Sequence, residues 1–259
     1  MYSCIKNTLI IHPEFNDELK GKMRTDMKKH ERLIFANYKN KEEYEDKYIK
    51  PKKYLNDNAQ LKHIQQFPYS KSQYMCSKFN NEIDNTLPEN IKYLQLGYSF
   101  NHTVDNLGSG LEHIVFGYEF NQRVDNLPFT IKSLIFGYSF NQTVDNIPCS
   151  IVRLELSYSF NQKIDDLPIG LEILVIGKNF SHNINCLPST LVHLEIKSKY
   201  YNDDHYNKKV LNICALPKNL KEIDFIDKNR YDRYGGTKIE KYDIHNIKYK
   251  FGKKNIDFF

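Results

Sequence analysis

Apolar residues recur along the middle of the chain with a period of 20 residues. Each period contains an apolar triplet with spacings of three and two residues, for example Ile131, Leu134 and Phe136. A phenylalanine, in most periods followed by asparagine, recurs at Phe100, Phe120, Phe140, Phe160 and Phe180. A fixed period in this range is the signature of stacked supersecondary units, each too small to bury its own apolar face. The sequence therefore predicts a solenoid that can fold only as an array.

The apolar triplet predicts one short strand in each unit. In the stretch from Leu171 to Ile176, strand alternation sends Leu174 and Ile176 inward and the residues between them outward, as in leucine-rich repeats. The proline of each Leu-Pro or Ile-Pro dipeptide, such as Pro128, lies between strands because it lacks the N–H that a sheet ladder needs. Since 20 residues leave little room for a helix, we expect a mainly β fold: a leucine-rich-repeat-like solenoid of ~20-residue repeats with one short parallel strand per repeat and little helix.

Two polar columns accompany the phenylalanine column, which we expect to form a buried spine of stacked rings. The asparagines that follow the phenylalanines can satisfy backbone groups exposed by the neighbouring coil; they are Asn101, Asn121, Asn141 and Asn161. The aspartates of the second column would repel one another unless each accepts backbone N–H bonds in its turn; they are Asp105, Asp125, Asp145 and Asp165. A calcium ladder is the alternative for this column, but the glycines of the GGxGxD calcium repeat are missing.

The repeats become degenerate toward the N-terminus. Residues 9–19 align without a gap on residues 174–184, so a first repeat begins near Leu9. Residues 33–38 echo residues 134–138, and residues 61–64 echo residues 111–114.

Extra residues interrupt the repeats at two places. A charged stretch, residues 39–53, separates the first degenerate repeats. Residues 213–225 match residues 184–196 at an offset of 29, which leaves nine extra residues around residues 201–206. We therefore divide the chain into an N-terminal cap with degenerate repeats and a charged insertion, a repeat solenoid, and a basic C-terminal cap whose strands cover the open sheet edge. These parts are residues 1–78, 79–225 and 226–259.

The charge is unevenly distributed along the chain. Residues 79–196 contain 6 Lys and Arg against 13 Asp and Glu, whereas the flanks contain 31 against 19. Because nucleic-acid binding requires a positive face, we expect no nucleic-acid partner for the array. No apolar run reaches the length of a membrane span and the N-terminus lacks a signal-peptide pattern, so we expect a cytoplasmic protein without a membrane partner. The five cysteines are widely spread without a CxxC pair, which favours reduced thiols over disulfides or a zinc site.

The sequence carries no recognisable catalytic pattern. An enzyme needs a convergent, non-repeating set of nucleophile, base and stabiliser. His182 and Cys186 lie four residues apart, but they reproduce structural positions of the neighbouring repeats. We therefore expect a non-enzymatic protein, with no catalytic residue, no metal ligand and no cofactor.

The outward strand positions are the candidate partner-binding face. Val115, Ile135, Ile173 and Val175 are apolar where solvent favours polar residues, and such a mixed surface suits a protein partner. The alternative is that β-branched residues simply suit a strand. The residues predicted to form this face are Tyr93, Val115, Ile135, Arg153, Ile173, Val175 and His193.

A second candidate surface is a column of tyrosines just after the strands. Tyrosine is a common contact anchor in protein interfaces, but these rings can equally stack against the neighbouring coil. The column consists of Tyr98, Tyr118, Tyr138 and Tyr158.

The repeated phrase resembles the FNIP repeat, a leucine-rich-repeat-like unit of social amoebae and of giant viruses that infect amoebae. The residues that carry the resemblance are 137–142, with Leu127-Pro128 before them and Ile147-Pro148 after them. The uniform spacing and the Val-Asp-Asn phrase look most like the viral members. The resemblance implies a protein-interaction scaffold whose partner is a host or viral protein, in the host cytoplasm if the chain is viral. Many family members carry an F-box, which implies a substrate-binding adaptor of a ubiquitin ligase as the alternative, although residues 1–50 show no F-box pattern.

Overall fold

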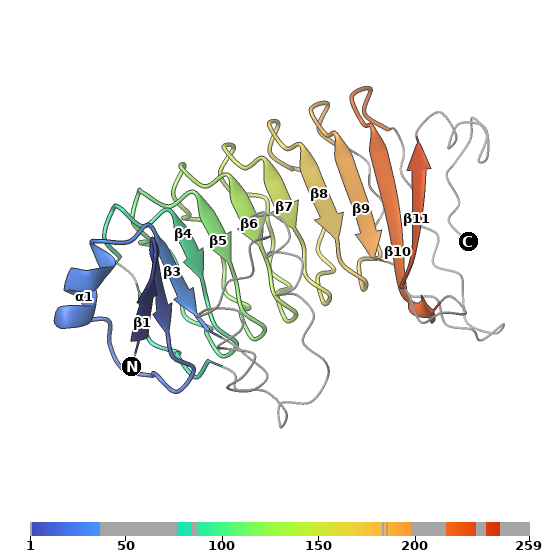
Figure 1. Ribbon diagram of the computed structural model, residues 1–259. Coiled ribbons are helices and arrows are strands. Elements are labelled where there is room, and N and C mark those ends of the chain that lie inside the picture. Colours follow the sequence, from blue (N-terminus) through green and yellow to red (C-terminus); the bar gives the residue numbers. More distant parts are fainter. Residues whose placement is uncertain are drawn as a thin grey trace.

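The computed structural model describes residues 2–36, 77–83, 87–182, 184, 186–197, 216–231 and 237–243. Their strands form one 11-stranded sheet in which each strand lies beside its neighbours in the sequence (Figure 1). Strands β2 to β10 all pair in parallel, and β1 and β11 pair antiparallel at the two ends. The strands are β1 (Tyr2–Ile5), β2 (Thr8–Ile11), β3 (Arg32–Phe35), β4 (Tyr93–Gln95), β5 (His113–Val115), β6 (Ser133–Ile135), β7 (Arg153–Glu155), β8 (Ile173–Ile176), β9 (His193–Lys197), β10 (Glu222–Tyr231) and β11 (Thr237–Asp243).

The register of the sheet follows the sequence period. Ile114 pairs with Leu134, the residue 20 positions later, and every pair of neighbouring strands from β4 to β9 has the same step. Between β9 and β10 the step is 29 residues, because His193 pairs with Glu222. The prediction of one short parallel strand per repeat is therefore confirmed, and so is the longer offset. The extra residues 201–206 that accompany this offset lie outside the described residues.

The degenerate N-terminal repeats also form strands of the same sheet. Leu9 of β2 pairs with Leu33 of β3, and Leu33 pairs with Leu94 of β4. The strands predicted near Leu9 and Leu33 are thus confirmed, whereas the charged stretch 39–53 and the echo at 61–64 lie outside the described residues. At the other end β11, which contains Tyr242, pairs with β10.

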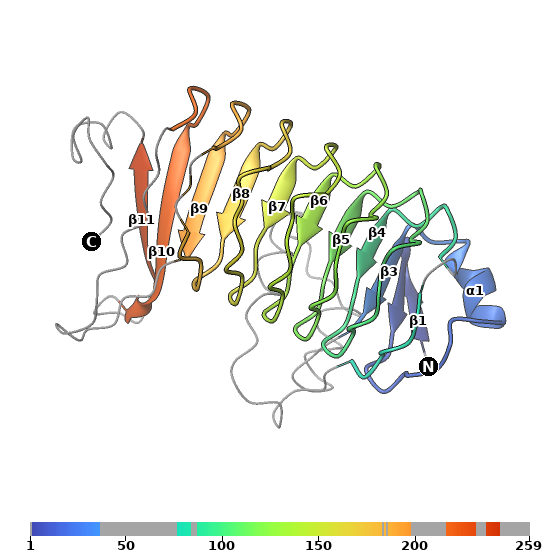
Figure 2. The ribbon, with the colours of Figure 1, turned by 180° about the vertical axis from the view of Figure 1, so that it is seen from behind.

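The segments that return from one strand to the next cross the opposite side of the sheet, as Figure 2 shows from behind. The apolar core fills the space between the strands and these return segments, and it includes Leu134 of β6 and Phe136 just after it.

Little helix is expected from the sequence, and the helix of the described residues is short. It is α1 (Lys22–Met27), which buries Met23 and Met27 in the first coil. The helix takes the place of an irregular return segment in a coil whose residues depart from the repeat. Among the described residues, no helix is long and apolar enough to cross a membrane.

The phenylalanine column forms the predicted buried spine. Phe140 is completely buried, and its ring centroid lies 6.1 Å from those of Phe120 and Phe160 in the coils on either side. The ring of Phe136, which follows the strand, stacks on the same ring with a centroid distance of 3.6 Å. The column extends N-terminally through Phe79, so the degenerate first coils share the same core.

An asparagine ladder runs parallel to the spine. It confirms the expectation that the asparagines after the phenylalanines satisfy backbone groups of the neighbouring coil. The Asn161 backbone N–H donates to Asn141 Oδ1 at 2.8 Å, and the Asn141 N–H donates to Asn121 Oδ1 at the same distance. Gln162 Nε2 adds a second donor to Asn141 Oδ1 at 3.3 Å. The same bond also joins the first coils, where Asn16 Oδ1 accepts from the Asn80 N–H at 3.0 Å. Each asparagine side chain therefore satisfies a backbone group of the following coil.

Replacing Asn141 by alanine is expected to lower the free energy of unfolding by about 1–2 kcal/mol, because the Asn161 backbone N–H loses its acceptor and Gln162 Nε2 keeps only its bond to the backbone oxygen of residue 141. Asn141→Asp retains an acceptor oxygen at the same place and should lose less. Urea denaturation followed by circular dichroism measures both variants. Equal losses for the two would show that the acceptor is not what this position contributes.

The aspartate column accepts hydrogen bonds from side chains of the next coil. Asn126 Nδ2 donates to Asp105 Oδ1 at 3.2 Å, and Asn146 Nδ2 donates to Asp125 Oδ1 at 3.5 Å. Arg123 also pairs with Asp125 at 2.6 Å. The sequence predicts backbone N–H donors from the same turn, whereas the donors to Asp105 and Asp125 are asparagine side-chain amides of the next coil. These bonds offset the repulsion between stacked charges.

Candidate interaction surface

The outer face of the sheet carries two columns of side chains, one from each outward strand position. The first column contains Tyr93, His113, Ser133, Arg153, Ile173 and His193, and the second contains Gln95, Val115, Ile135, Glu155, Val175 and Glu195. In-register pairing places the members of each column side by side along the sheet. All seven residues of the predicted partner-binding face therefore lie on one side of the sheet, as expected from strand alternation.

The two columns differ in exposure. Four members of the first column are partly exposed: His113, Arg153, Ile173 and His193. Val115, Ile135 and Val175 of the second column are only 2%, 1% and 1% exposed.

The expectation that the apolar residues of the second column are open to solvent is wrong, and Tyr93 of the first column is buried as well. Each second-column side chain is flanked by its register partners in both neighbouring strands, for example Val115 by Gln95 and Ile135. Ile34, Tyr93, Val115 and Ile135 also pack into a separate apolar cluster on this face. The β-branched residues of this column therefore act in packing, in line with the alternative stated for them.

Charged and aromatic contacts fix the first column. Arg153 Nε donates to Glu155 Oε1 at 2.9 Å, which pairs the buried Glu155 carboxylate with a cation. The Arg32 guanidinium lies 4.1 Å from the centroid of the Tyr93 ring, and the Tyr93 ring lies 6.4 Å from that of His113. Because a carboxylate with so little exposure needs its partner, Arg153 has a structural task in addition to any contact it makes outside the protein.

The tyrosine column stacks as a ladder of rings. The ring centroids of Tyr118 and Tyr138 are 4.6 Å apart with an interplanar angle of 5°, and the neighbouring pairs have similar geometry. Lys178 Nζ lies 5.9 Å from the Tyr158 ring at the C-terminal end of the stack. Stacking against the next coil, the second of the two interpretations for these rings, is therefore confirmed. The ring faces contact one another, so a partner would meet mainly their edges.

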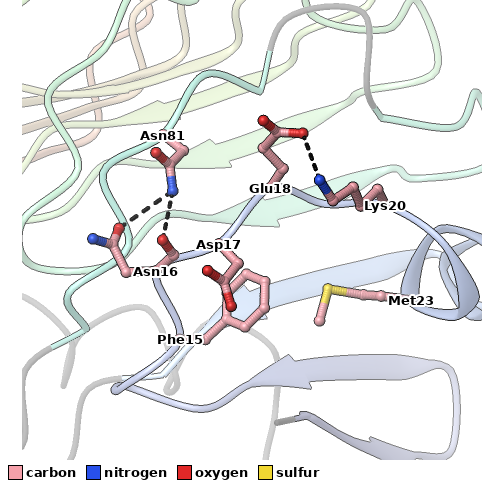
Figure 3. A pocket seen from close by; sticks show the side chains of 7 residues that line it. All are labelled: Phe15, Asn16, Asp17, Glu18, Lys20, Met23 and Asn81. Atoms are coloured by element: carbon pink, nitrogen blue, oxygen red, sulfur yellow. Dashed lines mark hydrogen bonds and ion pairs between the residues drawn. The ribbon is translucent and has the colours of Figure 1, made fainter.

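A pocket of about 490 Å³ lies beside the first coil, away from the predicted face. Figure 3 shows its lining, in which Asn81 Nδ2 donates to the Asn16 backbone oxygen at 2.9 Å and Lys20 pairs with Glu18 at 3.3 Å. Phe15 and Met23 form its apolar part and belong to the core. These polar groups bond to one another, and within the described residues no group of three or more His, Cys, Asp or Glu could hold a metal ion.

The exposed turns that precede the strands are not predicted from the sequence. Phe129 and Ile169 are 79% and 82% exposed, and they occupy the same turn position two coils apart. Cys149, at the same position of the coil between them, is also exposed. The sequence does contain a signal for these exposed turns. In the three coils the residue after Leu-Pro or Ile-Pro is Phe, Cys or Ile, whereas the equivalent residues of the flanking coils are Ser109 and Ser189.

Four segments of the chain match the FNIP Repeat model. They are residues 79–107, 103–139, 123–159 and 160–199. The FNIP repeats thus coincide with the part of the sheet from β4 to β9, where the spine, the asparagine ladder and the tyrosine ladder are most regular.

One solved structure with similarity to this chain is described as CroV588, a novel circular LRR protein. The sequences are 21% identical, and the match covers 86% of this chain and 41% of that chain with a TM-score of 0.31. This chain therefore spans about two-fifths of the length of that protein. No curated protein matches the sequence.

Proposed function

We propose that the protein is a non-enzymatic repeat scaffold that binds another protein through the first column of its sheet face. The observation that carries the proposal is the contrast between repeated and variable positions. The spine and the asparagine ladder recur from coil to coil, whereas His113, Arg153 and Ile173 differ at one equivalent position. These three residues are partly exposed and held in register by the sheet.

The chemistry of the first column suits a protein partner. Ile173 supplies apolar contact, Arg153 a cation already oriented by Glu155, and His113 and His193 supply donors or acceptors. Interfaces between proteins combine an apolar centre with polar groups of this kind, and arginine is enriched in them. A rigid, regularly spaced support lowers the entropy cost of presenting such groups.

The variants that test this surface follow from the exposure of the two columns. Val115 and Val175 are unsuitable because they are buried, and substituting them would disturb the fold. Ile173→Ala together with His193→Ala truncates two partly exposed members of the first column. Thr143→Ala together with Lys163→Ala is the matched control, because both residues are exposed on the return segments.

The first-column variant is expected to lose a protein captured by the tagged full-length chain, with a dissociation constant raised about 30-fold when that protein is purified and titrated. The control pair should bind as the original chain does, and circular dichroism melting should be similar for all three proteins. Undiminished binding by the first-column variant would refute this surface. Recovery of cullin-type ligase components with the chain would instead support the ubiquitin-ligase adaptor function that the resemblance implies.

A further inference from the structure

Three consecutive turns, which precede β6, β7 and β8, present apolar or weakly polar side chains to solvent. Phe129 and Ile169 are the exposed large hydrophobic residues of the described chain, and the exposed Cys149 stands between them. We name these three residues the turn-tip ridge. Ser109 and Ser189 occupy the same position in the two flanking coils. The ridge is therefore a bounded patch, unlike the singly scattered apolar residues that occur on any surface.

Hydrogen bonds hold each of these turns in the same conformation. The Ile131 N–H donates to the Pro128 carbonyl oxygen at 3.1 Å, and the equivalent bonds in the next two coils measure 3.2 and 3.0 Å. Adjacent coils are spaced by the strand separation of about 4.8 Å, so two coils separate the Phe129 and Ile169 side chains by about 10 Å. Two turns of an α-helix rise about 10.8 Å. Because Cys149 is smaller than its two neighbours, an apolar side chain of a helix can pack over it.

The stretch of chain that carries the ridge has more exposed carboxylates than exposed cations. From residue 129 to residue 172 the exposed acids are Asp145, Asp165, Asp166 and Glu172, and the exposed cations are Lys132 and Lys163. Lys132 is already paired with a carboxylate of the preceding coil at 2.5 Å. A complementary partner therefore combines an apolar stripe with positive charge beside it.

Two large side chains of roughly 150–200 Å² each fall well short of the ~800 Å² per partner that a standard interface buries, so the ridge suits a small contact with any partner. Charge argues against two other occupants. Two copies of this chain would bring their acidic coils together. Anionic phospholipid surfaces attract lysine and arginine, not aspartate, and so the same acidic coils oppose membrane binding.

We propose that the turn-tip ridge is a docking site for a basic amphipathic helix of a partner protein. Phe129 and Ile169 contact the apolar stripe of the helix, one of its side chains packs over Cys149, and its lysines or arginines face Asp145 and Asp166. This site lies in the turns that precede the strands and shares no residue with the first column of the sheet face. It does not depend on the function proposed for that face.

The probe for this site is a synthetic amphipathic helix of about 18 residues made of leucine and lysine, long enough to form a helix. A peptide with glutamate in place of every lysine is its charge control. The leucine–lysine peptide is expected to bind the full-length chain in isothermal titration calorimetry, and the leucine–glutamate peptide about tenfold more weakly or less. Phe129→Ser and Ile169→Ser should each weaken binding about 30-fold. Ser109→Ala with Ser189→Ala, at the same turn position of the flanking coils, should leave it unchanged.

Binding that survives in the Phe129→Ser/Ile169→Ser double variant would overturn the proposal, and so would equal affinity for the two peptides. Self-association in sedimentation velocity that the double variant abolishes would assign the ridge to a second copy. Ridge-dependent binding to vesicles of phosphatidylcholine and phosphatidylserine would assign it to a membrane. Either result would also overturn the proposal. Ile173→Ala with His193→Ala should bind the peptide normally, so failure of the ridge proposal can be told apart from failure of the sheet-face proposal.

Discussion

Replacing Phe140 by alanine is expected to lower the free energy of unfolding by about 3–5 kcal/mol. The ring is completely buried, and it stacks between Phe120 and Phe160 as well as on Phe136. The neighbouring rings are tied to their own coils and cannot move together to close the cavity. The variant should therefore lose the transfer free energy of the ring and retain most of the void.

Urea denaturation followed by circular dichroism measures this effect, and Phe129→Ala provides the control within the same residue type. Because Phe129 is 79% exposed, its truncation should change the free energy of unfolding by less than about 0.5 kcal/mol. A loss below about 1 kcal/mol for Phe140→Ala would mean that the spine is not a main source of stability.

Substituting Gly137 by alanine is expected to cost about 3 kcal/mol, although only one methyl group is added. A Cβ atom at Gly137 would overlap the Gly117 backbone oxygen in the preceding coil. Since the obstacle is a backbone atom, the two coils must move apart, and the hydrogen bonds between them on both sides of Gly137 would lengthen. Ser157 holds the equivalent place in the next coil, where its Oγ donates to the Phe140 carbonyl oxygen at 2.7 Å. Alanine at Gly137 has no such compensating bond.

Gly170→Ala is the matched control for this prediction. A Cβ at Gly170 would meet its nearest neighbour, the Cys149 backbone oxygen, at 3.5 Å, which is an ordinary contact. Thermal unfolding of the two variants should therefore show a large drop in melting temperature for Gly137→Ala and little change for Gly170→Ala. Similar melting temperatures would contradict the close approach of the coils at Gly137.

The features that the sequence predicts well are those that repeat. A side chain that returns after a fixed interval must meet its own equivalent in the next coil, so the phenylalanine spine and the asparagine ladder follow from spacing alone. The same reasoning locates the strand near Leu9, even though few of its residues match the repeated phrase.

The solvent exposure of individual residues is harder to predict from the sequence. Alternation tells which side of a strand a residue faces, but it does not tell how closely neighbours pack on that side. For this reason the sequence places Val115, Ile135 and Val175 on the correct face with the wrong exposure. Helix α1 is not predicted for a related reason, since it lies in a coil whose residues no longer follow the repeat. The turn-tip ridge is visible in the sequence only as a departure from serine at one position of the coil.

The asparagine ladder determines which insertions and deletions the solenoid can accept during evolution. Each rung joins a side chain to the backbone of the following coil in the same geometry, so rungs are interchangeable. Removing residues 121–140 would bring Asn141 next to Asn101, whose Oδ1 now accepts from the Asn121 N–H at 2.9 Å, and the rung can form again. A deletion that is not a whole number of coils would leave the rungs out of phase. Duplication or deletion within the gene can therefore add or remove whole coils. The deletion of residues 121–140 would also remove Phe129 and so change the set of side chains on the exposed turns in a single step.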